Sequence, residues 1–201
     1  MNVLIGFEQS GIIREAFKKR GHNAWSCDLL PSLIPGQHLR CDIFDAFDHF
    51  PKKWDLIILH PPCTCLSVSG NHVYAKGKKK YQERIDAVAY TIELWIIAKY
   101  YGKRVCLENP VGVLTTMTNM GVKPQYIQPF QFGHSESKKT GLWLYNLPEL
   151  KPTGILEKPA CGYWENQTPS GQNKLGSSKG RWKIRSKTYQ GIADCMAATW
   201  G

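Results

Sequence analysis

Residues 55–63 read DLIILHPPC, and this stretch decides the fold. The unbroken apolar run is typical of a strand that is buried on both faces of a sheet. Two consecutive prolines then end the strand and hold the chain extended and rigid. We therefore predict a central strand over residues 55–59, with Cys63 fixed just beyond its carboxyl end.

Similar short apolar runs lie on both sides of this stretch, and segments with helical spacing separate them. The predicted strands are 2–6, 23–27, 38–41 and 104–107, and the predicted helices are 10–20, 81–101 and 189–200. Alternating strands and helices favour an α/β fold with a mostly parallel, doubly wound, Rossmann-like sheet. Further along, residues 126–132 and 142–146 predict an antiparallel hairpin. We expect ligands beyond the carboxyl ends of the parallel strands.

The chain has a net charge of +10, and the charge is unevenly distributed. Four lysines lie within residues 76–80, and the segment 151–187 carries eight basic residues against two acidic ones. These two segments account for the whole excess, a distribution that favours a polyanionic partner, namely nucleic acid. A solvated basic face is the alternative for either segment taken alone.

The chain is long enough for one sizeable core. It has no apolar stretch of membrane-spanning length and no signal-peptide pattern, so we expect a cytoplasmic protein that does not associate with a membrane. The sequence suggests no obligate protein partner. Seven scattered cysteines favour reduced thiols, and their spacing does not suit zinc, so we expect no metal.

Cys63 and Glu108 are the candidate catalytic residues. Cys63 follows the proline pair, so we expect it to be accessible, unlike a cysteine within an apolar run. Cys65 is the competing thiol, for which we expect a packing role. Glu108 follows the predicted strand 104–107, which brings its carboxyl group close to Cys63 if the two strands are neighbours. This pair suits methylation at C5 of cytosine, in which a thiolate adds to C6 while an acid delivers a proton or a hydrogen bond to ring N3.

The segments Pro61-Pro62-Cys63 and Glu108-Asn109-Pro110 resemble the Pro-Cys and Glu-Asn motifs of the cytosine-C5 DNA methyltransferase family. Residues 171–175 and 185–194 resemble the compact members that bacteriophages carry. The resemblance covers nearly the whole chain. It implies a Rossmann-like fold, S-adenosylmethionine as cofactor, DNA as partner, and methyl transfer to C5 of cytosine through a covalent bond between Cys63 and C6.

The resemblance also implies binding residues, with the acid Asp28 holding the ribose hydroxyls and the pair Asp42 and Ile43 contacting the adenine. The cofactor residues that it implies are Phe7, Glu8, Gly11, Asp28, Asp42, Ile43 and Pro61. The substrate residues that we expect are Asn109, Lys76, Lys78, Lys79, Lys138, Lys139, Arg181 and Arg185.

We expect three regions: a catalytic domain over 1–150, a basic irregular segment over 151–187 that serves as a reduced target-recognition region, and a C-terminal helix within 188–201 that packs back on the catalytic domain. In the basic segment, Tyr163, Trp164 and Trp182 are candidates for stacking on unpaired bases.

Two features of the sequence depart from the family pattern. The first cofactor loop retains only Gly6 and Gly11, and the residues 137–140, SKKT, stand where the family has its Gln-x-Arg-x-Arg motif. Because of these departures, a non-catalytic nucleic-acid-binding relic of a methyltransferase is an alternative interpretation of the chain. RNA or a free nucleotide is an alternative substrate for the same chemistry. Amino-group methylation is disfavoured because His60 and Cys63 flank the prolines, where that chemistry uses an acid or amide and an aromatic residue.

Overall fold

The computed structural model describes residues 1–50, 53–175 and 188–201. These residues form a seven-stranded sheet in the order β3-β2-β1-β4-β5-β7-β6, in which β7 is antiparallel to both of its neighbours. The strands are β1 (Asn2–Gly6), β2 (Asn23–Cys27), β3 (His38–Leu39), β4 (Leu56–Leu59), β5 (Val105–Pro110), β6 (Gln125–Ile127) and β7 (Thr140–Tyr145). The predicted Rossmann-like α/β fold with an antiparallel C-terminal hairpin is confirmed.

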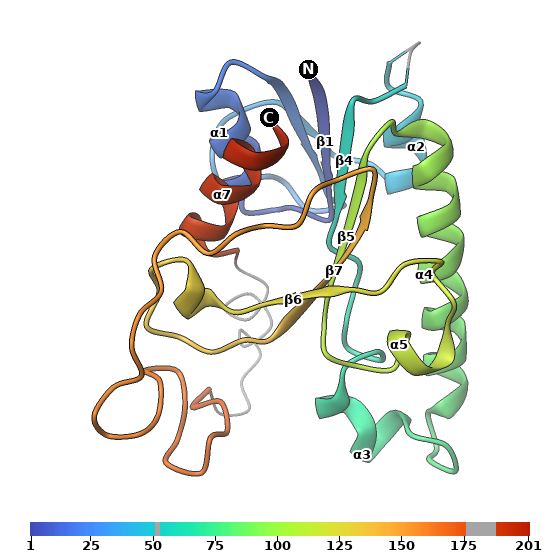
Figure 1. Ribbon diagram of the computed structural model, residues 1–201. Coiled ribbons are helices and arrows are strands. Elements are labelled where there is room, and N and C mark those ends of the chain that lie inside the picture. The colour runs from blue at the N-terminus through green and yellow to red at the C-terminus, as the bar shows by residue number, and fades with distance from the viewer. Residues whose placement is uncertain (51–52, 176–187) are drawn as a thin grey trace.

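Helices cover both faces of the sheet (Figure 1). They are α1 (Ile12–Lys19), α2 (Ile43–Phe47), α3 (Asn71–Tyr74), α4 (Tyr81–Tyr101), α5 (Leu114–Met117) and α7 (Gln190–Trp200), with 3-10 turns at Val68–Gly70 and Pro129–Gln131. Side chains alternate along each strand. Ile58 of β4 packs in the core beneath α1 and α7, whereas Ile57 packs in the core beneath α2 and α4.

The carboxyl ends of the parallel strands all lie at one edge of the sheet, on the side where α3 and residues 150–175 are found (Figure 1). The last residue of β1 is a glycine, Gly6, because a Cβ atom at this position would lie 2.5 Å from Cδ1 of Ile43 and 2.7 Å from Cδ2 of Leu59. The close packing of these two side chains draws the ends of β1 and β4 and the start of α2 together.

The observed strands differ from the predicted ones at their ends. β5 continues through Pro110, so Glu108 and Asn109 are strand residues, because antiparallel pairing with β7 extends the ladder to the Pro110 and Thr140 pair. β6 is shorter than predicted, since a 3-10 turn beginning at Pro129 ends it.

The predicted C-terminal helix is present as α7, and it packs against α1 with Ile192, Met196 and Trp200 buried (Figure 1). Residues 151–175 form turns and isolated bridges, as expected of an irregular segment. In the described part of the chain, no helix is long and apolar enough to cross a membrane.

Candidate active site

The two motifs with candidate catalytic residues lie at the carboxyl ends of neighbouring strands. β4 and β5 are parallel, with Leu59 opposite Leu107, so the chain places His60 next to Glu108. The side chain of Asn109 donates a hydrogen bond from Nδ2 to the carbonyl oxygen of Pro61, at 3.2 Å. The Pro-Pro-Cys loop is therefore tied directly to the strand that carries Glu108.

Cys63 is partly exposed at the start of a tight turn. Its carbonyl oxygen accepts hydrogen bonds from the amides of Leu66 (3.1 Å) and Ser67 (2.9 Å). Cys65 lies two residues further on, is also partly exposed, and contacts Tyr74 of α3. The backbone thus fixes the position of Cys63, as the proline pair predicts.

Arg84 of α4 holds the same turn in place, and no feature of the sequence predicted this role. The side chain is 3% exposed, and its guanidinium donates to the carbonyl oxygens of Cys65 (2.6 Å) and Ser67 (3.4 Å) and to Oδ1 of Asn71 (2.9 Å). A planar group with several donors can hold three acceptors at once. Arg84 therefore fixes the chain immediately after Cys63.

Glu108 pairs with His60 through a hydrogen bond of 3.0 Å between Nδ1 and Oε2. Both side chains are largely buried, with 15% of His60 and 18% of Glu108 exposed. Burial by itself raises the pKa of Glu108, but the hydrogen bond and charge of His60, the charge of Lys138 and a hydrogen bond from Thr140 together lower it below its ordinary value. Glu108 is accordingly held as a carboxylate.

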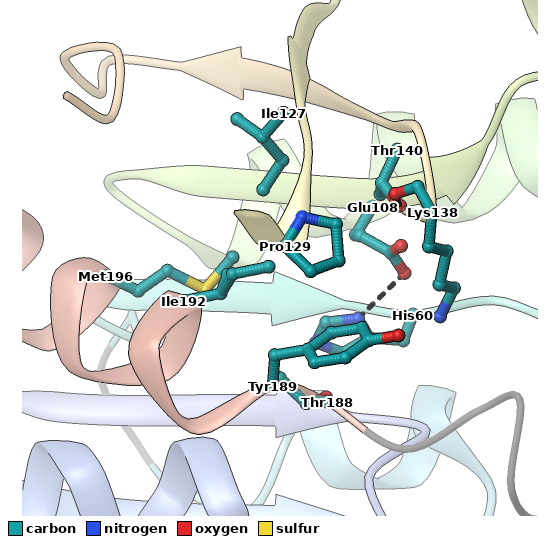
Figure 2. Close-up of a pocket in the computed structure, with 10 residues that line it drawn as sticks. All are labelled: His60, Glu108, Ile127, Pro129, Lys138, Thr140, Thr188, Tyr189, Ile192 and Met196. Atoms are coloured by element: carbon teal, nitrogen blue, oxygen red, sulfur yellow. Dashed lines mark hydrogen bonds and ion pairs between the residues drawn. The ribbon is translucent and has the colours of Figure 1, made fainter. Parts of the chain in front are cut away.

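A small cavity of about 40 Å³ lies beside this pair (Figure 2). The cavity is lined by His60, Glu108, Ile127, Pro129, Lys138, Thr140, Thr188, Tyr189, Ile192 and Met196. Figure 2 shows His60 and Glu108 pointing toward one another, with the Lys138 side chain alongside. The volume suffices for about three water molecules. Cys63 is not among the residues that line it.

The two lysines of residues 137–140 point to different places. Lys138 lines the cavity near Glu108, whereas Lys139 is exposed and its Nζ lies 4.6 Å from the centroid of the Tyr126 ring. The structure brings Lys138, but not Lys139, to the Glu108 carboxylate. Tyr189, which the sequence did not single out, faces the same cavity, and its hydroxyl donates to Oε2 of Glu136 at 2.6 Å.

At the ends of β1 and β2, the loop between β1 and α1 is held closed by the side chain of one of its own residues, Glu8. Phe7 adopts the left-handed conformation with φ of 61°, which is uncommon for a residue other than glycine. The next residue, Glu8, is 3% exposed, and its carboxylate accepts hydrogen bonds from the amides of Ile13 (2.7 Å) and Arg14 (3.2 Å) at the start of α1. Gly11 immediately precedes α1 with φ of 72°.

Burial raises the pKa of Glu8, and the opposing effects of the Ile13 and Arg14 amides and of the charges on His60 and Arg14 are smaller. The first amides of a helix are the usual site for a ligand carboxylate or phosphate. Here Glu8 occupies two of them, so its side chain acts within the protein instead of facing a ligand.

The acids after β2 and β3 also bond to the neighbouring backbone. Oδ1 of Asp28 accepts from the Leu30 amide at 2.9 Å, and Oδ1 of Asp42 caps α2 through the Phe44 amide at 2.9 Å. Asp28 is partly exposed and Asp42 is exposed, so both can still meet a ligand. Ile43 is 3% exposed and packs over Gly6, which leaves little of its side chain for an adenine ring.

Arg14 orders the loop between β2 and β3, although it lies in a helix where a charged residue is normally exposed. Its side chain is completely buried. The guanidinium donates to the hydroxyls of Ser26 (2.9 Å) and Ser32 (3.1 Å) and to the carbonyl oxygens of Ile34 (3.2 Å) and Pro35 (3.0 Å).

The predicted substrate residues outside this centre are on the surface or not described. Lys76, Lys78 and Lys79 are exposed between α3 and α4. Arg181 and Arg185, with Trp182, lie outside the described residues. Trp164 is 6% exposed and stacks on Phe130 with the ring centroids 4.7 Å apart, so its proposed role in stacking on unpaired bases is wrong.

The arrangement defines a Rossmann-like α/β protein with a thiol, a carboxylate and an imidazole at the carboxyl edge of its sheet. No protein-family model matches the chain. No curated protein matches it either.

Among solved structures, the chain is similar in fold to a prophage-encoded protein of E. coli described as a DNA modification methyltransferase, with 12% identity and a TM-score of 0.53. The match covers 77% of this chain and 51% of that one, so the chain spans about half the length of that protein. The Entamoeba histolytica methyltransferase EhMeth matches at 12% identity over 80% of this chain and 58% of its own, with a TM-score of 0.47.

Proposed function

We propose that this protein is a DNA methyltransferase that transfers a methyl group from S-adenosylmethionine to C5 of cytosine. The observation that carries the proposal is the placement of Cys63 and Glu108. The Pro-Pro-Cys loop and the Glu-Asn strand lie at adjoining strand ends and are joined by the hydrogen bond between Asn109 and Pro61. The fold, shared with a structure described as a DNA modification methyltransferase, agrees with this chemistry.

In the proposed mechanism, the target cytosine leaves the DNA stack so that its C6 becomes accessible. The Cys63 thiolate adds to C6, and a proton reaches ring N3 from the carboxyl group of Glu108, which makes C5 nucleophilic. S-adenosylmethionine, when bound, supplies the electrophilic methyl group. Loss of the C5 proton and departure of the thiolate then restore the aromatic ring. The small cavity has to widen to admit a base.

The edge beside β2 fits part of this cofactor. The partly exposed Asp28 carboxylate is an acceptor suited to two ribose hydroxyls, and the exposed side chains of Leu29 and Leu30 offer apolar surface next to it. The proposed cofactor residues are Phe7, Gly11, Asp28, Asp42 and Pro61, with Ile43 contributing only the small exposed part of its side chain. Glu8 is the exception, because its carboxylate already takes the two α1 amides.

DNA as the substrate is supported by charge. Lys76, Lys78 and Lys79 are exposed on the connection that follows the Cys63 loop, where they can contact phosphates. Lys138, which lines the cavity beside Glu108, is proposed to contact the target nucleotide. We propose that the protein acts in the cytoplasm, which is that of the host cell if a phage encodes it. RNA or a free nucleotide is the alternative substrate if DNA is not methylated.

A labelled-methyl assay with cytosine-containing DNA tests the proposal, comparing the wild type with Cys63→Ala and with Cys65→Ala as the matched control. We expect 5-methylcytosine from the wild type and from Cys65→Ala, and a loss of at least about 1,000-fold in Cys63→Ala. Full activity in Cys63→Ala would overturn the mechanism.

A second candidate is a non-catalytic nucleic-acid-binding relic of a methyltransferase. The specific observation in its favour is the occupation of the α1 amides by Glu8. Calorimetry with S-adenosylmethionine separates the two functions, because the enzyme binds the cofactor and the relic does not.

A further inference from the structure

His60 is the cavity residue that the proposed mechanism leaves without a role. It comes directly after β4, and its Nδ1 lies 3.0 Å from Oε2 of Glu108. Its other ring nitrogen, Nε2, is buried and has no hydrogen-bond partner among the described residues. A purely structural histidine would normally satisfy both nitrogens, because an unpaired buried polar atom is costly. The imidazole is therefore better explained by a role in the chemistry of the site.

Charged and titratable groups surround His60 on several elements. Glu108 of β5 binds it directly, and the Glu8 carboxylate of the loop after β1 interacts with its charge. The charge of Lys138, from the segment before β7, acts on Glu108, and the charge of Glu108 in turn acts on the thiol of Cys106 within β5.

Two of the neighbouring groups stay neutral. Burial raises the pKa of the Cys106 thiol well above its usual range, and burial with the hydrogen bond to Glu136 raises that of the Tyr189 phenol. His60 therefore lies close to two acidic side chains, Glu8 and Glu108, and is hydrogen-bonded to the second of them.

The proposed reaction creates a demand that Glu108 cannot meet alone. Ring N3 must receive a proton when the thiolate adds to C6, but the surroundings of Glu108 keep it ionised, and a carboxylate has no proton to give. The nearest group that can carry this proton is the imidazole hydrogen-bonded to the carboxylate.

We propose that His60 is a positioning residue that stores the proton which Glu108 passes to N3 of the target cytosine, an inference that rests on the proposed function. In this proposal the pair of His60 and Glu108 carries one transferable proton along the hydrogen bond between Nδ1 and Oε2. As the bond between the Cys63 sulfur and C6 forms, the electron pair of the C5–C6 double bond shifts into the ring toward N3. N3 takes a proton from the carboxyl group, which takes the Nδ1 proton in turn. Elimination of the thiolate returns the proton along the same path.

The first test is the pH profile of kcat for His60→Asn, with the exposed His49→Asn as the matched control. The asparagine amide can still donate a hydrogen bond to Glu108 but carries no transferable proton. We expect kcat at pH 8 to fall about 100-fold and the alkaline decline in rate to move to lower pH, with DNA affinity unchanged. A uniform loss of rate with an unaltered pH profile would mean a structural role only and would overturn the inference.

The second test needs no turnover. Carbon-13 NMR of the Glu108 carboxyl group should show it titrating at higher pH in His60→Asn than in the wild type, because the group that opposes the effect of burial is gone. An unchanged titration would contradict the inference even in an active enzyme. A wild type that transfers no methyl group to cytosine would instead overturn the proposed function, and with it this role of His60, whatever the titration shows.

Discussion

The two halves of the sheet edge treat their polar groups differently. At the β1/β2 end, defined by residues 7–11, Asp28 and Asp42, each carboxylate accepts a hydrogen bond from a nearby backbone amide. At the β4/β5 end, defined by residues 60–63, Glu108 and Asn109, two buried side-chain atoms, Nε2 of His60 and Oδ1 of Asn109, have no partner among the described residues.

This difference indicates which part of the sheet edge is less stable because it keeps polar atoms available for function. Polar groups that a protein satisfies internally stabilise it, whereas buried polar groups without partners cost stability and persist mainly at functional sites. The β1/β2 end therefore satisfies its own polar groups and is self-supporting, whereas the β4/β5 end leaves two polar atoms for the substrate that we propose binds there.

The largest expected effect is that of Arg14→Met, which disturbs the loop between β2 and β3 that supports the β1/β2 end. Loss of the guanidinium leaves the carbonyl oxygens of Ile34 and Pro35 and two serine hydroxyls without their buried donor. We expect the free energy of unfolding to fall by about 3 kcal/mol, measured by urea denaturation. Lys18→Met, on the exposed side of the same helix, is the control and should change it by less than about 0.5 kcal/mol. Equal losses would contradict a self-supporting β1/β2 end.

An intermediate effect is expected beside the β4/β5 end, where Lys76, Lys78 and Lys79 are changed together to Gln. The plot of log binding constant against log salt concentration for DNA should become shallower by about 0.9 for each lysine that contacts a phosphate. Lys18, Lys19 and Arg20, which are exposed at the end of α1 away from the carboxyl edge, provide a charge-matched control when they are changed together to Gln. The same change in slope from both sets would show non-specific attraction only.

The smallest effect concerns Glu8→Gln and the pH dependence of stability. The folded protein binds the Glu8 proton more tightly than the unfolded chain, because burial raises the pKa of this group above its ordinary 4.5. Its contribution is therefore complete below pH 4.5 and is lost as the pH rises through the raised pKa. The stability of Glu8→Gln relative to the wild type should increase over that window, as followed by urea denaturation at a series of pH values. A relative stability that falls with pH would refute the sign of the shift.

The sequence predicted the sheet and the meeting of the two motifs because both depend on local patterns. Buried parallel strands leave continuous apolar runs, and the residues that follow them must share an edge. The prolines before Cys63 gave a further local signal, which agrees with the tight turn observed there.

The partners of these residues could not be predicted, because long-range packing determines them. His60 and Glu108 are 48 residues apart, and their contact depends on the register between β4 and β5. Arg14 and Arg84 are polar residues in helices, and only the loops that fold over them make them buried. The same holds for Trp164, whose stacking on Phe130 removes it from the surface.

The central claim is that Cys63 bonds to C6 of cytosine, and DNA with 5-fluorocytosine tests it most directly. After methyl transfer the fluorine cannot leave C5 as a proton does, so the enzyme remains joined to the base. Incubation with S-adenosylmethionine followed by peptide mass spectrometry should find the adduct on Cys63 in the wild type and in Cys65→Ala, and none in Cys63→Ala. An adduct on Cys65, or methyl transfer to ordinary DNA by Cys63→Ala, would contradict the account.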